Sequence, residues 1–354
     1  SSGSLTVNAK SLDVSGLTAD SKAYDGGLSA TLSGAETLTD GGASNSDGLY
    51  LTNDVVSLTG TASGSFSDKN VADAKTVTVT GLSLTGTDAG NYRLNTITTT
   101  GDITPKTVSL SASKTYDGTT DLTGAVTLAT GVGSETLTYT GATASDAHVA
   151  TVDKFINAIT LTDATDASGG LASNYQLPTL DAANAAVTIN AATLTPTLSN
   201  TDVSKVYDGN TSSTMTPTYT FSGLVSGDTA ADLSHTALAY DDKDVLDASK
   251  VTVSGLSISA ITGGNNSVAS DYVLDATSKE VAASITAKAL SVTYTGVNKV
   301  YDGDIAATVT TSDDRVSGDD VTIEREASFA DKNVAQGKSI AVSGVTLSGT
   351  DESN

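Results

Sequence analysis

The sequence Lys22-Ala23-Tyr24-Asp25-Gly26 occurs four times in this chain, with only its second residue changed. The other copies begin at Lys114, Lys205 and Lys299, and the successive tyrosines are 92, 91 and 94 residues apart. A period this regular indicates tandem copies of one unit. The motif Lys-x-Tyr-Asp-Gly therefore predicts four repeats, and its spacing sets how the chain divides.

Each residue type in this motif has a structural role that can be predicted. Asp-Gly between strand-forming residues predicts a tight type I′ hairpin turn, because glycine adopts positive φ without steric cost. The tyrosine can bury its ring while its hydroxyl reaches a polar partner. The lysine should cover apolar surface with its stem and keep its charge in water. The alternative is a binding site or a covalent cross-link that uses the lysine.

Two further motifs follow in the same order. Phe-x-Asp-Lys-Asn-Val occupies residues 66–71 and 329–334, and Gly-Thr-Asp-x-x-Asn-Tyr-x-Leu occupies residues 86–94. The middle repeats depart from the first of these motifs. In repeat 2, His148 replaces its Asn, and in repeat 3, Tyr240 replaces its Phe and Asp244 its Asn. The candidate structural residues are Lys22, Tyr24, Asp25, Gly26, Tyr92, Lys114, Tyr116, Asp117, Gly118, Tyr175, Lys205, Tyr207, Asp208, Gly209, Tyr272, Lys299, Tyr301, Asp302 and Gly303.

The apolar pattern between the motifs is that of β-strands. Residues 76–80, Thr-Val-Thr-Val-Thr, alternate with period two, and Gly81 interrupts the alternation as a bulge or bend would. No stretch has the pattern of a long amphipathic helix. We therefore predict an all-β chain of tandem small domains, each a sandwich or a grasp-like sheet.

The period places the repeats at residues 5–104, 105–190, 191–286 and 287–354. The fourth is incomplete, because Asn354 stands one residue before the position of Tyr92 in repeat 1, and we expect it to be the least stable. The junctions between repeats are short, so we expect an elongated rod, roughly 150 Å long for four units in line. The opening Ser1-Ser2-Gly3-Ser4 is typical of a linker.

Composition excludes several classes of function. With 41 acidic and 18 basic residues among 354, the net charge is −23, which argues against nucleic-acid binding. The chain has no cysteine, so disulfides, zinc thiolates and cysteine nucleophiles are excluded. No apolar run approaches the length of about 18 residues that a membrane span needs, so no membrane insertion is expected.

No catalytic or cofactor constellation recurs between repeats. The two histidines, His148 and His235, stand at different places in their repeats, so we predict no enzyme and no cofactor. Acidic loops at residues 241–244, 313–314 and 319–320 offer oxygen ligands that suit calcium, although such loops also serve as solvated surface. The remaining alternative is a functional site found in repeat 1 alone, in its insertion at residues 41–48.

Taken in order, the three motifs resemble those of YDG-type repeat domains, which are related to MBG domains. Such domains occur in large secreted bacterial adhesins of the filamentous-haemagglutinin, two-partner-secretion kind. The resemblance implies extracellular or cell-surface stalk repeats that contact neighbouring repeats of the same chain and project an adhesive region for attachment and biofilm formation. The alternative class is a binding module whose repeats themselves contact a host or matrix glycan or protein.

Overall fold

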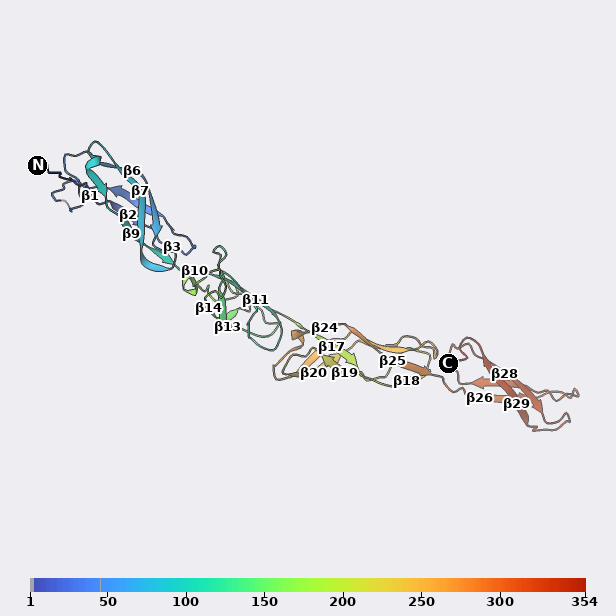
Figure 1. Cartoon of the computed structure of the whole chain (residues 1–354). Helices are drawn as coiled ribbons and strands as arrows, with labels where there is room; N and C mark the ends of the chain where they lie inside the picture. The colour runs from blue at the N-terminus through green and yellow to red at the C-terminus, as the bar shows by residue number, and fades with distance from the viewer. Residues whose placement is uncertain (1–2, 45) are drawn as a thin grey trace. The chain divides into compact units, whose positions relative to one another are not determined.

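The computed structural model describes residues 3–44 and 46–354. Ser1 and Ser2 of the expected linker, and Asn45 of the insertion at residues 41–48, lie outside the described residues. The described chain consists of β-strands and three single-turn 3-10 helices, with no α-helix among those residues (Figure 1). No helix in this part of the chain is long and apolar enough to cross a membrane. The predicted all-β class of tandem small sheets is confirmed.

The contacts divide the chain into two units. Unit 1 comprises Ser1–Lys114, Thr119–Ala147 and Thr151–Ile189, and unit 2 comprises Thr115–Gly118, His148–Ala150 and Asn190–Asn354. Two short segments of repeat 2 thus belong to unit 2, together with repeats 3 and 4.

Repeat 1 mixes parallel and antiparallel pairs. Its elements are β1 (Lys10–Leu12), β2 (Ser15–Ala19), β3 (Lys22–Ala23), β4 (Ser29–Ala30), β5 (Leu32–Thr37), β6 (Ser57–Phe66), β7 (Ala72–Thr85), η1 (Ala89–Asn91), β8 (Tyr92–Leu94) and β9 (Ile97–Thr104). A five-stranded sheet has the order β3-β9-β7-β6-β4, β1 pairs with β8 in parallel, and β2 pairs with β5 in antiparallel orientation.

Repeat 2 keeps this order of elements in smaller sheets. They are β10 (Lys106–Thr107), β11 (Ser109–Thr115), β12 (Val126–Ala129), β13 (Thr138–Ala144), β14 (Ile156–Thr162), η2 (Ala172–Asn174), β15 (Tyr175–Gln176) and β16 (Val187–Asn190). The pairs β10-β15 and β13-β14 and the sheet β12-β11-β16 correspond to pairings in repeat 1.

Repeats 3 and 4 continue the pattern in unit 2. Repeat 3 has β17 (Ala192–Leu198), β18 (Val203–Val206), β19 (Tyr219–Ser222), β20 (Asp228–Ser234), β21 (Ala237–Tyr240), β22 (Lys250–Ser254), β23 (Ser257–Gly263), η3 (Ala269–Asp271), β24 (Tyr272–Leu274) and β25 (Ser278–Thr286). Repeat 4 has β26 (Val292–Val297), β27 (Thr308–Asp313), β28 (Thr322–Phe329) and β29 (Ile340–Ser348). The sheets are β19-β17-β24, β18-β25-β22-β21, β20-β23, β26-β27 and β28-β29.

The period-two prediction for residues 76–80 is confirmed in β7. Val77 and Val79 are buried, and Thr76, Thr78 and Thr80, which alternate with them, are exposed. Burying an aliphatic side chain of this size contributes about 1.5–3 kcal/mol. The register of β6 against β7 shifts between Gly60 and Ser63, next to Gly81, which has positive φ. A Cβ on Gly60 would meet the Gly81 carbonyl oxygen at 2.1 Å, so the predicted bulge depends on glycine.

The predicted type I′ turn at Asp-Gly is wrong. β3 pairs with β9 in parallel and β4 pairs with β6, so the motif does not join two strands of a hairpin. Gly26 has φ +75°, but Asp25 is not among the residues at positive φ, which a type I′ turn would require. Asp25 instead accepts the Gly27 N–H at 2.8 Å through Oδ1, which is a side-chain-stabilised turn.

Candidate functional site at the repeat ends

The motif lysine is enclosed by its own turn rather than left in water. Lys22 Nζ donates to Asp25 Oδ1 and to the Gly27 carbonyl, each at 2.8 Å, and lies 5.4 Å from the centre of the Phe66 ring. Lys205 and Lys299 do the same, over the rings of Tyr240 and Phe329. Lys114 donates to the carbonyls of Thr119 and Asp121.

This arrangement explains why the first two motifs recur together. The aromatic residue that opens Phe-x-Asp-Lys-Asn-Val supplies the ring face for the lysine charge, which is a favourable cation–π contact. The bond from Lys205 lowers the pKa of Asp208, so the ion pair persists at neutral pH. The predicted wet lysine charge is therefore wrong, because the turn supplies carbonyl and carboxylate oxygens in place of water.

The motif tyrosine contacts an acidic residue of the following repeat. Tyr24 is 1% exposed, and its hydroxyl donates to Glu135 Oε1 at 2.8 Å. Tyr175 donates to Glu135 Oε2 at 2.7 Å, and its ring meets the ring of Tyr24 edge to face with centroids 5.4 Å apart. Lys69 completes the cluster through an ion pair with Glu135. In unit 1, all three motifs thus converge on one carboxylate.

Corresponding contacts occur in unit 2. Tyr207 donates to Asp319 Oδ1 at 2.9 Å. Tyr116 shares a hydrogen bond of 2.6 Å with Ser267, which donates to Asp228 Oδ2. Tyr272 also donates to Asp228, and its ring meets the Tyr116 ring edge to face with centroids 5.8 Å apart.

Repeat 1, in unit 1, has the counterpart of the bond between Tyr272 and Asp228. There, Tyr92 donates to Asp54 Oδ2 at 2.6 Å.

The acidic residue at this contact was not predicted from the sequence. It recurs three residues after an aliphatic one, in the pairs Leu51 with Asp54, Val132 with Glu135, Val225 with Asp228, and Val316 with Asp319. A search for an aliphatic residue followed by Asp or Glu at this place in every repeat would have found it. The signal is weak because Glu replaces Asp once.

In two of these pairs, Val132 with Glu135 and Val316 with Asp319, the aliphatic residue lies against the motif glycine of the preceding repeat. A Cβ on Gly26 would lie 2.9 Å from Val132 Cγ1, and one on Gly209 would lie 2.7 Å from Val316 Cγ1. Real Cβ atoms do not approach so closely. Glycine is thus required here both for its positive φ and for the close approach of the next repeat.

A second contact joins the other two motifs. The backbone N–H of Val71 donates to Asn174 Oδ1 at 2.9 Å, and Asn174 Nδ2 donates to Asn70 Oδ1 at 3.1 Å. The counterparts are Val149 and His148 with Asp271, and Val245 and Asp244 with Asn354. The side-chain pair changes from Asn-Asn to His-Asp to Asp-Asn, and each pair joins a donor to an acceptor. Where repeats 2 and 3 depart from the motif Phe-x-Asp-Lys-Asn-Val, the residue that they contact in the next repeat therefore changes in a complementary way.

These contacts define two ends for each repeat. We call Tyr24, Gly26, Lys69, Asn70 and Val71, with their counterparts in the other repeats, the tyrosine end. We call Val132, Glu135, Asn174 and Tyr175, with their counterparts, the acid end.

Burial and hydrogen bonding shift the pKa values at this contact in opposite directions. Burial raises the pKa of Glu135, but the bonds from Lys69, Tyr175 and Tyr24 outweigh it and hold that pKa below its usual value. Burial and the bond to Glu135 raise the pKa of Tyr24. Burial and the bond to Asp319 raise the pKa of Tyr207 to about 12. The cluster is thus a carboxylate that accepts bonds from neutral tyrosines at physiological pH.

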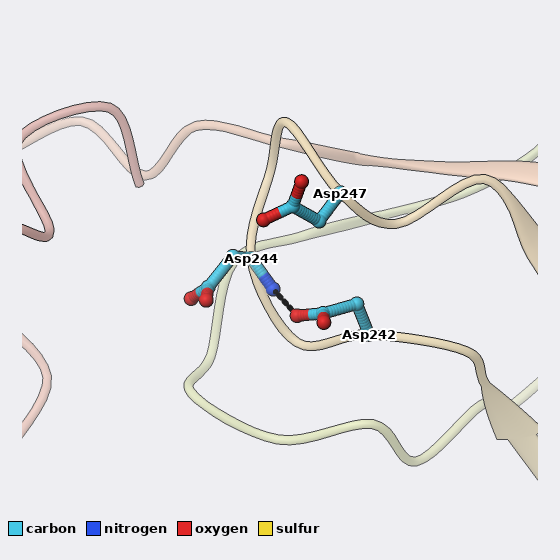
Figure 2. Close-up of side chains that lie close together, drawn as sticks. All are labelled: Asp242, Asp244 and Asp247. Carbon is cyan, nitrogen blue, oxygen red and sulfur yellow. Dashed lines mark hydrogen bonds between the residues drawn. The ribbon is translucent and has the colours of Figure 1, made fainter.

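The acidic loops considered for calcium form internal hydrogen bonds. Asp242, Asp244 and Asp247 place one oxygen each within 4.8 Å of one another. The Asp242 carboxylate accepts the Asp244 N–H at 2.9 Å, the hydrogen bond that is dashed in Figure 2. Lys243 and Asn354 also donate to Asp244. The cluster lies beside the tyrosine end of repeat 3, and oxygens of Asp242 and Asp244 accept hydrogen bonds from protein donors.

The other predicted ligands also have protein partners. Asp241 accepts bonds from Ser249, Asp313 pairs with Arg315, Asp314 pairs with Lys288, and Asp319 accepts from Tyr207. The insertion of repeat 1 is held through Asp47, which pairs with Lys10. None of these bonds depends on a metal ion.

The fold and these contacts together define a class of protein: an all-β tandem-repeat chain whose recurring motifs face the next repeat. The sequence model described as "YDG domain" matches residues 8–100, 190–279 and 286–354, so the chain belongs to the YDG-domain family. No curated protein sequence matches the chain.

Two solved structures show weak similarity. The crystal structure of the S-layer protein rSbsC(31-844) is 17% identical, with a TM-score of 0.16, and the structure of surface layer protein SbsC, domains 1-6, is 15% identical, with a TM-score of 0.14. Each match covers 95% of this chain and 52% of the other, so this chain spans about half their length. Scores this low carry no argument about the fold.

Proposed function

We propose that the chain is a run of structural repeats that extends a bacterial cell-surface or secreted adhesin and projects an adhesive region for attachment and biofilm formation. The observation that supports this proposal is that residues of the motif Lys-x-Tyr-Asp-Gly contact the following repeat. The Tyr24 hydroxyl and the bare Cα of Gly26 meet the following repeat, rather than lining a ligand pocket. A motif with this role is expected to recur in every repeat, whatever the distal region binds.

The surface chemistry suits such a role. A net charge of −23 keeps neighbouring stalks from associating non-specifically. The expected partners are neighbouring repeats of the same chain, while host or matrix contacts belong to the adhesive region. We further propose that the repeats act without catalysis, because no acid, base and nucleophile set recurs among them.

Small-angle X-ray scattering tests this proposal directly. An extender should give a maximum dimension of roughly 150 Å for four repeats in line, unchanged when EDTA replaces calcium. A radius of gyration near the roughly 20 Å expected for a compact globule of this length would contradict the proposal. A dimension that collapses in EDTA would instead make the acidic loops structural ligands.

The alternative, that the repeats themselves bind glycans, makes a different prediction. Sugar sites commonly present exposed aromatic rings, yet among the described tyrosines only Tyr301 is exposed. We therefore expect no glycan binding by the chain on an array. Binding that survives Tyr301→Ala would favour the alternative.

A further inference from the structure

The polypeptide enters repeat 3 at its acid end and leaves it at its tyrosine end. Ala192, the first residue of β17, pairs with Tyr272, which belongs to the acid end. Thr286, the last residue of β25, accepts the backbone N–H of the motif residue Tyr207 at 2.8 Å. Tension along the chain therefore pulls the two ends of the repeat away from each other.

The opening and closing strands of repeat 3 run side by side in the same direction. β17 pairs with β24 in parallel over three residue pairs. β18 pairs with β25 in parallel over four residue pairs, beginning with Val203 and Ala283. The bond from the Tyr207 N–H to the Thr286 carbonyl lies directly beyond the last of these pairs. We call the pairing of β18 with β25, together with this bond, the parallel ladder.

Repeat 1 has the same pairing. β1 pairs with β8 in parallel over three residue pairs, and β3 pairs with β9 in parallel over two, where Lys22 lies opposite Ile103. The Tyr24 N–H donates to the Thr104 carbonyl at 2.9 Å. Ile103 is 1% exposed, and Ile285, at the corresponding place in β25, is 3% exposed. The ladder is therefore a feature of the repeat fold, with the core packed behind it.

The direction of the load decides how a parallel ladder breaks. Its hydrogen bonds run across the gap between two strands, evenly spaced along them. When the two strands are pulled from opposite ends, they must slide past each other, so all the bonds carry the load together. When both are pulled from the same end, the load falls on one bond after another. Rupture of several bonds in one step has the higher barrier, and that barrier sets the rate of unfolding under load.

We propose that the parallel ladder, with its counterpart in repeat 1, is a load-bearing clamp that keeps the repeat folded while the chain is under tension. Tension on repeat 3 pulls β18 toward the acid end and β25 toward the tyrosine end, which is the sliding direction. Sliding also draws Ile285 out of the core cluster that it forms with Tyr207, Tyr240 and Val251. Buried apolar surface thus adds to the resistance of the hydrogen bonds.

This inference goes beyond the proposed function, because an extended chain need not resist tension. The resistance depends on the order and direction of the strands within one repeat, whatever a distal region binds. Scattering measures the extended form and stretching measures the clamp, so either result can fail while the other holds.

Single-molecule stretching of the whole chain in optical tweezers tests the clamp. The chain has no cysteine, so two introduced thiols are the only attachment points for DNA handles. Thr201→Cys with Ala287→Cys pulls the ladder from opposite ends, because Thr201 precedes β18 and Ala287 follows β25. Thr201→Cys with Ala282→Cys pulls it from one end, because Ala282 precedes the first pair of the ladder, Val203 with Ala283.

The two double variants are matched controls for each other. They share Thr201→Cys and differ only in which alanine carries the second thiol, and all three replaced side chains are exposed. Circular dichroism and guanidinium unfolding without load should therefore show the two variants equally folded and equally stable. Any difference under load then reports the direction of pulling.

The unfolding rate of repeat 3 at one constant force is the readout. Each further hydrogen bond that must break in the same step slows unfolding about fivefold. We expect the variant pulled from opposite ends to unfold about tenfold or more slowly than the variant pulled from one end. Equal rates, or faster unfolding when the ladder is pulled from opposite ends, overturn the proposal and leave the scattering test of the proposed function untouched.

Discussion

Replacing Tyr24 with phenylalanine removes the hydroxyl that joins the tyrosine end of repeat 1 to Glu135 in repeat 2. The hydroxyl lies 2.8 Å and 3.0 Å from the two carboxylate oxygens, and the Glu135 side chain is only 9% exposed. A hydrogen bond to a charged group contributes about 1.5–3 kcal/mol. Tyr24→Phe should therefore destabilise the contact by about 2 kcal/mol, with no change in the strands of repeat 1.

A double-mutant cycle separates this bond from the rest of the cluster. Glu135→Gln also weakens the contacts with Tyr175 and Lys69, so its own cost is larger than the bond energy. The coupling between Tyr24→Phe and Glu135→Gln should be about 1 kcal/mol, because Tyr24→Phe removes the bond and Glu135→Gln removes the charge that strengthens it. Native-state hydrogen exchange read by mass spectrometry is the suitable assay, since it reports stability for each segment of a multidomain chain.

The pH dependence of the same contact has a definite sign. The pKa of Glu135 is lower in the folded chain than its ordinary value of 4.5. Its contribution to stability is thus fully present above pH 4.5 and is lost as the pH falls below 4.5 through the folded pKa. We expect the cost of Tyr24→Phe to shrink over that acidic window.

Two results would refute this reasoning. One is a coupling energy near zero at neutral pH, which would mean that the hydroxyl and the carboxylate do not interact in solution. The other is an equal cost for the matched control Tyr301→Phe, whose side chain is 57% exposed and should tolerate the change within about 0.5 kcal/mol.

Two further predictions concern the same contact in unit 1. Gly26→Ala should cost about 1–2 kcal/mol for its positive φ and about 1 kcal/mol more for the clash with Val132. Gly303→Ala should cost only the first amount, because nothing lies within 4 Å of its Cβ position, and equal costs by hydrogen exchange would contradict the predicted clash. Asn70→Asp and Asn174→Asp should each cost less than about 1 kcal/mol, because each leaves a donor opposite an acceptor. The double variant places two carboxylates together and should cost about 2 kcal/mol beyond the sum of the singles, so additive costs would show that the pair does not interact.

The local structure of the repeats could be read from the sequence because it depends on residues close together along the chain. The spacing of the tyrosines revealed the repeats, and the alternation at residues 76–80 predicted a strand with Val77 and Val79 buried. The shift of register beside Gly81 was likewise a local signal. Such patterns reflect the two-residue period of a strand and the freedom of glycine, both of which are properties of the backbone itself.

The tertiary structure decided what each motif residue contacts. The sequence suggested a hairpin at Asp-Gly and a wet lysine, but parallel pairing of β3 with β9 and the oxygens around Lys22 replaced both. The partner of Tyr24 is 111 residues away and can be Asp or Glu, so no local pattern points to it. Which hydroxyl bonds which carboxylate depends on how one folded repeat packs against the next. That packing depends on the shape and polarity of both folded surfaces, which residues far apart in the sequence build together.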